Sequence, residues 1–151
     1  MKNIIKKYLV IAAISAGIFT ACDIAATDPL MDIIKEDKGY IPVVAGWTLR
    51  TPAAAALTPG ANAVFDLRYW SEGEIDKIRF FVKIGDAENQ MVSEQDYSPA
   101  YSNITKTDSL LINYTLPSTV AVGTPVIFRA EVTNRNLPDY PVGRSLTLPV
   151  R

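Results

Sequence analysis

Residues 40–151 alternate between apolar and polar side chains with a period of two, and this pattern constrains the fold more than any other feature. Five runs show this alternation most clearly. Their alternate apolar residues include Phe65-x-Leu67-x-Tyr69, Ile78-x-Phe80-x-Val82, Leu110-x-Ile112-x-Tyr114, Val126-x-Phe128-x-Ala130 and Leu146-x-Leu148-x-Val150. Successive side chains of a β-strand point to opposite faces, so each run predicts a strand with one buried face.

Glycine and proline residues separate these runs, and no segment after Gly39 has a helical period. The breaks fall at Pro52, Pro59-Gly60, Gly73, Gly85, Pro99, Pro117, Gly123, Pro138, Pro141 and Gly143. We also expect strands over Tyr40–Leu49 and, at an edge, around Asp96–Thr105. The sequence therefore predicts one all-β domain, an antiparallel sandwich of about seven strands and of the size of an immunoglobulin-like domain.

The composition excludes several classes of function. The 151 residues include no His and one Cys, which removes His-based triads, imidazole metal ligands and disulfide frameworks. The net charge is −1, without the clustered Lys and Arg that nucleic-acid binders carry. We expect no cofactor, no metal and no nucleic-acid partner.

Residues 1–21 have the layout of a secretory signal peptide. Three lysines, Lys2, Lys6 and Lys7, precede an uncharged and mostly apolar run from Tyr8 to Ala21. The length of this run suits the apolar part of a signal peptide, whereas a membrane-spanning helix needs about 20 apolar residues. It ends with small residues directly before Cys22, the only cysteine of the chain.

The segment Phe19-Thr20-Ala21-Cys22 resembles the lipobox of bacterial lipoproteins, although the lipobox usually has Leu where this chain has Phe19. The resemblance implies cleavage before Cys22, acylation of its thiol and attachment to a membrane through the acyl chains. Cleavage would remove three lysines from the 15 basic residues and none of the 16 acidic ones, which leaves a net charge of −4.

Residues 22–39 are expected to join the acylated cysteine to the sandwich of residues 40–151. The stretch after Cys22 is acidic and contains one short apolar patch, Leu30–Ile34. We interpret it as a tether that lifts the domain off the membrane. A short helix over Pro29–Lys38, with Asp28 as N-cap, is the alternative.

The order of the last segments resembles immunoglobulin-like and fibronectin type III-like modules. Val122–Thr133 is a turn followed by a long strand, Asn134–Gly143 is a polar loop and Ser145–Val150 is a short last strand. The cysteine pair and buried tryptophan of antibody domains are absent from the pattern. With the lipobox, the chain resembles small immunoglobulin-like lipoproteins of Bacteroidetes outer membranes, some of which accompany polysaccharide uptake while others are adhesive.

Three carboxylates, Glu72, Glu74 and Asp76, alternate next to a turn. They would suit a general acid–base pair or calcium ligands. Their spacing is not that of a calcium loop, so a solvated hairpin loop is the favoured interpretation.

Two aromatic side chains, Trp70 and Phe81, fall on the polar side of their strands. With the Ser71–Glu74 turn as a hairpin, the two would be cross-strand neighbours, and if the protein binds a ligand we expect their rings to bind a sugar or a protein. Packing beneath a neighbouring loop or across strands is the favoured interpretation. The segment Asp108-Ser109-Leu110 is similar to the O-glycosylation motif of exported Bacteroidetes proteins, which implies modification of Ser109.

These features predict a non-catalytic, membrane-anchored binding or scaffolding module at the outer membrane. The anchored domain would face the periplasm or the cell surface, with a glycan or another outer-membrane protein as partner and polysaccharide capture as one accessory role. A fimbrial or adhesive subunit is one alternative. A glycan hydrolase that uses Glu72, Glu74 or Asp76 is another.

Overall fold

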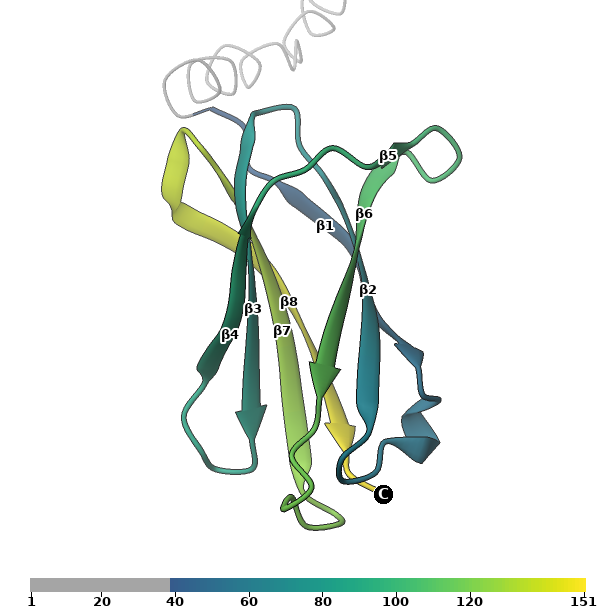
Figure 1. Cartoon of the computed structure of the whole chain (residues 1–151). Coiled ribbons are helices and arrows are strands. Elements are labelled where there is room, and N and C mark those ends of the chain that lie inside the picture. The colour runs from purple at the N-terminus through teal and green to yellow at the C-terminus, as the bar shows by residue number, and fades with distance from the viewer. Residues whose placement is uncertain (1–38) are drawn as a thin grey trace, which may run out of the picture. The chain divides into compact units, whose positions relative to one another are not determined.

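The computed structural model describes residues 39–151, which form two antiparallel β-sheets packed face to face (Figure 1). The strands are β1 (Val43–Thr51), β2 (Asn62–Trp70), β3 (Ile75–Ile84), β4 (Gln90–Asp96), β5 (Tyr101–Ser102), β6 (Thr107–Thr115), β7 (Pro125–Asn134) and β8 (Leu137–Pro149). A short 3₁₀ helix, Ala54–Ala56, lies between β1 and β2. The predicted signal peptide, Cys22 and nearly all of the tether lie outside the described residues.

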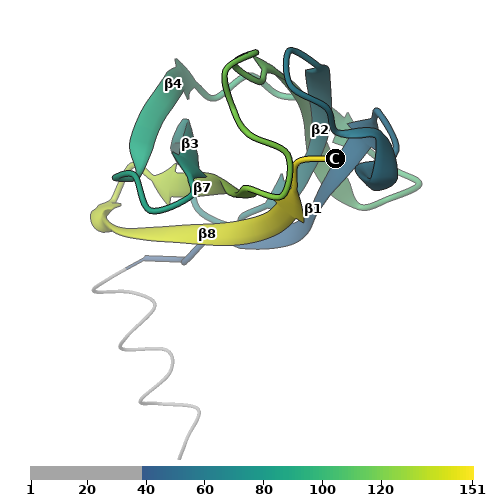
Figure 2. The same ribbon diagram turned by 90° about the horizontal axis from the view of Figure 1, so that it is seen from below.

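The strand order confirms the predicted immunoglobulin-like sandwich. One sheet has the order β1-β2-β6-β5 and the other β4-β3-β7-β8, which correspond to strands A-B-E-D and C′-C-F-G of immunoglobulin domains. The chain passes from one sheet to the other after β2, β4 and β6 (Figure 1), and Figure 2 shows the two sheets from below. Residues 39–151 contain eight strands, of which β5 has two residues.

The predicted inward faces form the core. Val126, Phe128, Ala130 and Val132 of β7 are all 0% exposed. The ring of Phe128 lies 4.6 Å from that of Phe65 in the opposite sheet, measured between ring centroids. Burial of such aromatic side chains supplies most of the hydrophobic stabilisation of a small sandwich.

Trp47 of β1 is buried, 6% exposed, and connects the two sheets. Its ring stacks on Phe65 at 4.9 Å, and its indole N–H donates a hydrogen bond of 3.0 Å to the carbonyl oxygen of Phe128. The bond satisfies the only polar atom of the side chain. The core therefore does contain a buried tryptophan, on β1 rather than on the strand that carries it in antibody domains.

The predicted loop over Asn134–Gly143 is wrong, because β7 runs to Asn134 and β8 begins at Leu137. Asn134 pairs with Leu137, and the next pair is Val132 with Val142. The residues between these pairs, which include two prolines, form a bulge. An edge strand accommodates proline in this way, since its outer N–H groups have no ladder partner.

The edge strand predicted around Asp96–Thr105 lies earlier, at β4, and only the short β5 falls within the predicted range. All seven residues of β4 are exposed. A strand without a buried face has no alternation, so its sequence gives no period-two signal.

We predict that Phe128→Ala lowers the free energy of unfolding by about 3–5 kcal/mol, because it leaves a cavity between the sheets. Ile127→Ala, at the neighbouring and outward-facing position, should cost about 1 kcal/mol or less. Urea denaturation of both variants measures the difference. Equal losses would mean that the two faces of β7 are assigned the wrong way round.

Candidate functional site

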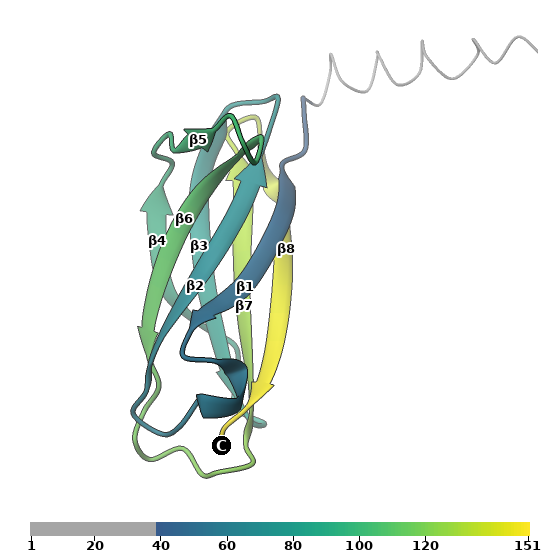
Figure 3. The same cartoon turned by 90° about the vertical axis from the view of Figure 1, so that its right-hand side faces the viewer.

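The end of the sandwich at which the chain enters is built from four segments, and we call it the proximal end. These are residues 39–42, the β2–β3 connection, the segment that contains β5, and the β7–β8 turn (Figures 1 and 3). Asn134, 1% exposed, ties three of them together. Its side-chain amide donates to the Tyr40 carbonyl and, at 2.6 Å, to the Ser71 hydroxyl.

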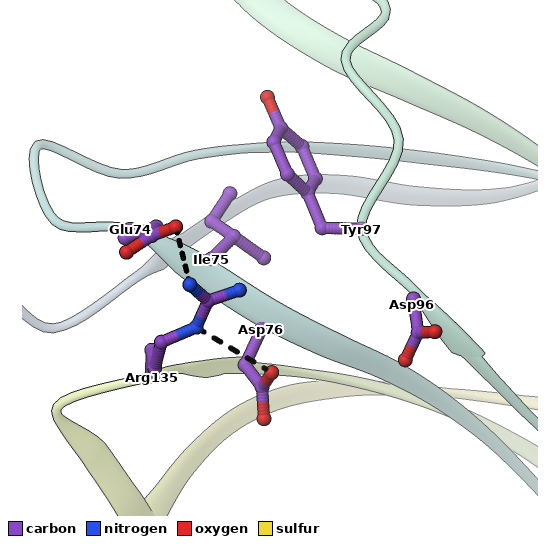
Figure 4. A pocket seen from close by; sticks show the side chains of 6 residues that line it. All are labelled: Glu74, Ile75, Asp76, Asp96, Tyr97 and Arg135. Atoms are coloured by element: carbon purple, nitrogen blue, oxygen red, sulfur yellow. Dashed lines mark hydrogen bonds and ion pairs between the residues drawn. The ribbon is translucent and has the colours of Figure 1, made fainter.

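A pocket of about 410 Å³ opens at this end. It is lined by Glu74, Ile75 and Asp76 at the start of β3, Asp96 and Tyr97 at the end of β4, and Arg135 in the β7–β8 turn (Figure 4). Two backbone hydrogen bonds hold these elements together: Arg135 N–H to the Glu74 carbonyl at 2.8 Å, and Tyr97 N–H to the Asp76 carbonyl at 2.9 Å.

Arg135 lies between two of the three carboxylates of the pocket (Figure 4). Its guanidinium is 2.7 Å from the Glu74 carboxylate and 4.0 Å from that of Asp76. The Arg135 and Glu74 side chains are 59% and 63% exposed, so water screens the pair and it stabilises the fold weakly. The pocket thus offers carboxylate acceptors and guanidinium donors to a polar ligand at an open surface.

The carboxylates of the pocket face water. The Glu74 side chain is 63% exposed and ion-paired with Arg135, and the Asp76 side chain is 33% exposed. Within residues 39–151, no cluster of three or more Asp, Glu, His or Cys side chains is arranged to hold a metal ion.

A buried polar cluster lies behind the pocket. Asp108, 5% exposed, accepts hydrogen bonds from the Tyr97 hydroxyl at 3.2 Å and from the Ala100 N–H at 2.7 Å. The ring of Tyr69 meets that of Tyr97 edge to face at 6.4 Å. Burial, followed by the nearby charge of Asp108, raises the pKa of both phenols above the usual value of about 10.

Trp70 and Phe81 are not neighbours, which corrects the prediction that their rings form one surface. Trp70, 37% exposed, ends β2 in the first sheet beside Val43. Phe81 is half-buried in the second sheet, paired with Met91 and Arg129. Because both side chains point away from the core, they lie on opposite outer surfaces of the sandwich.

The reason lies in the β2–β3 connection, which crosses between the sheets rather than closing a hairpin. Ser71 is bonded to Asn134 of β7 in the second sheet. A Cβ atom on Gly73 would come within 2.9 Å of the Asn134 amide nitrogen, so a larger residue would disturb the bonds of this amide to Tyr40 and Ser71. The predicted hairpin loop that carries Glu72 and Glu74 is therefore wrong in its connectivity.

The other predicted residues are scattered over the surface. Ser109 is exposed in β6, opposite Arg68, and is the third residue of the strand. Glu72 is exposed in the β2–β3 connection. The remaining candidate, Cys22, lies outside residues 39–151.

Sequence reasoning missed Asp96, Tyr97, Asp108 and Arg135 as members of one site. They come from segments far apart in the chain, and no local spacing connects them. No local signal marked the position of Arg135 either. Arg135-Asn136 connects β7 to β8, but the residues directly after it, Leu137–Val142, do not alternate.

Comparisons with known proteins identify no family for this chain. No family model matches it. Neither a curated protein nor a solved structure matches it. Within residues 39–151, no helix has the length and apolar character needed to cross a membrane.

We predict that the protein loses stability as the pH rises above about 10, and that Tyr69→Phe reduces this loss. The pKa of Tyr69 is raised in the folded state, so the unfolded chain gives up its phenolic proton first. The unfolded state then binds fewer protons, and the stability that is complete below pH 10 falls as the pH increases.

Urea midpoints from about pH 8 to about pH 11 measure the effect. Tyr101→Phe is the matched control, because the Tyr101 side chain is 56% exposed. An alkaline loss of the same size in Tyr69→Phe as in the wild type would contradict the assignment.

Proposed function

We propose that this chain is a non-catalytic, lipid-anchored module that binds or scaffolds at the outer membrane, of the type found in Bacteroidetes lipoproteins. The observation that carries the proposal is the position of Cys22. The only cysteine of the chain directly follows the small residues that end an apolar, lysine-preceded segment. Acyl chains on this residue would supply membrane affinity at about 0.8 kcal/mol per buried CH₂.

The anchor would also determine which part of the sandwich lies nearest the membrane. From Cys22 to Gly39 a fully extended chain reaches at most about 60 Å, and a flexible coil of this length spans about 20–25 Å on average. The described chain begins at Gly39, at the proximal end. Under the proposal, the pocket is therefore at the membrane-facing end of the domain.

A binding role is supported by the character of the surface. Trp70 and Val43, 37% and 40% exposed, form a small apolar area on the first sheet close to the proximal end. The pocket adds exposed carboxylates and a guanidinium. A glycan or another outer-membrane protein fits such a mixed aromatic and polar surface.

The rival assignment as a glycan hydrolase has less support. Glu74 is exposed and paired with Arg135, whereas glycosidases hold one carboxyl protonated by burial. Turnover on a panel of glycans that disappears in Glu74→Gln would contradict the non-catalytic assignment.

We predict that metabolic labelling with a palmitate analogue marks the wild-type protein and leaves Cys22→Ala unlabelled. The thiol of Cys22 is the only sulfhydryl in the chain, so no other residue replaces it. Fractionation should move the protein from the membrane to the soluble fraction in the variant. Equal labelling of both forms, or of neither, would contradict the anchor.

We predict that Trp70→Ala weakens ligand binding and that Phe81→Ala, on the opposite surface, leaves it unchanged. A glycan array and a pull-down from outer-membrane extract, run with both variants, separate a sugar from a protein ligand. Soluble oligosaccharide should compete only at a sugar site. A large drop in the melting temperature of Trp70→Ala would instead identify the ring as part of the packing.

A further inference from the structure

The four edges of the two sheets differ in how they are protected against pairing with another chain. An edge strand presents unpaired N–H and C=O groups, and natural proteins protect such edges with charges, prolines, bulges or a covering segment. On one side of the sandwich, β1 lies against β8, and the Arg144 guanidinium donates to the Ala45 carbonyl at 3.3 Å. On that side, β1 and β8 therefore protect each other's edges against pairing with another chain.

The edge formed by β4 is exposed but protected. Its pairing with β3 contains a register shift between Phe80 and Phe81, which marks a bulge. Glu94 and Asp96 place charges along it, and the Glu94 carboxylate is bound by Lys77 at 2.8 Å and by Arg79 at 2.6 Å. A bulge and a row of charges both oppose the addition of a further strand.

The edge formed by β6 has none of these devices. The two residues of β5 pair with Thr107 and Asp108 only, as the short strand at one end of β6 shows (Figure 3). From Ser109 to Thr115 the strand pairs with β2 without a register shift, and no strand among residues 39–151 pairs with its other side. This segment, Ser-Leu-Leu-Ile-Asn-Tyr-Thr, contains no charge, proline or glycine.

The side chains of this free edge are also incompletely covered. Leu111, on the outward face, is 50% exposed. On the inward face, Leu110 and Tyr114 pack against the core but remain only partly buried. A further strand along β6 would therefore complete the backbone ladder and cover apolar side chains at the same time.

We propose that β6 pairs antiparallel with β6 of a second copy of this chain, so that the two sheets continue into one another. The segment is self-complementary in a symmetric register centred on Ile112. Leu110 then lies opposite the second copy's Tyr114, and Leu111 opposite its Asn113. Apolar side chains meet on the inward face, and no like charges oppose each other. Such an arrangement closes as a symmetric dimer.

Sedimentation velocity of the mature chain, residues 22–151 with Cys22→Ser, tests the dimer from about 1 μM to about 500 μM. We expect a reversible monomer–dimer equilibrium. Asn113→Lys should weaken dimerisation about tenfold or more, because it places one cation from each copy beside the symmetry axis. Asn113 is exposed and pairs with Val64, so the variant should keep the wild-type melting temperature.

Val92→Lys is the matched control, since Val92 is 44% exposed on the β4 edge. This variant should dimerise as the wild type does. A wild type that stays monomeric throughout overturns the proposal. Dissociation by Val92→Lys without dissociation by Asn113→Lys overturns it as well. Because the tested chain cannot be acylated at position 22, its result is independent of the lipid anchor.

Discussion

The aromatic contact between the two sheets is the interaction on which the rest of the structure depends. Phe65 of one sheet lies 4.6 Å from Phe128 of the other, and the Trp47 indole both stacks on Phe65 and donates to the Phe128 carbonyl. These contacts fix the distance and the alignment of the sheets. The connections at the proximal end, and with them the pocket, are held in position by this alignment.

The core could be predicted from the sequence because alternation is a local property of each strand. Phe128 and its inward neighbours follow directly from it. The choice of sheet for each strand is not local, so the pattern placed Trp70 and Phe81 together although they lie in different sheets. The pocket was missed for the same reason, since Arg135 meets Glu74 and Asp76 only after β3 and β7 have paired.

Several charged side chains of the outer surfaces form cross-strand or neighbouring pairs. Arg79 pairs with Glu94 and Arg129 with Glu131 on the second sheet, and Arg68 pairs with Asp66 on the first. Exposed pairs of this kind contribute little to stability, so their main effect is on solubility and on which surfaces approach each other. The uncharged stretch of β6 differs from this surface, although it belongs to the same small domain.

Trp47 and Phe128 are in contact although they lie far apart in the sequence, and this affects when the chain folds during its synthesis. The hydrogen bond joins residues 81 positions apart, and β7 also lies in the centre of its sheet. A nascent chain that has not yet supplied β7 lacks Phe128, one of the ring contacts of Phe65, and an inner strand of the second sheet, so its interior stays incomplete. Folding is therefore a late and comparatively slow event in biosynthesis, since non-local pairings form slowly. The N-terminal segment is synthesised well before that event, so it is available to other proteins while the domain is still incomplete.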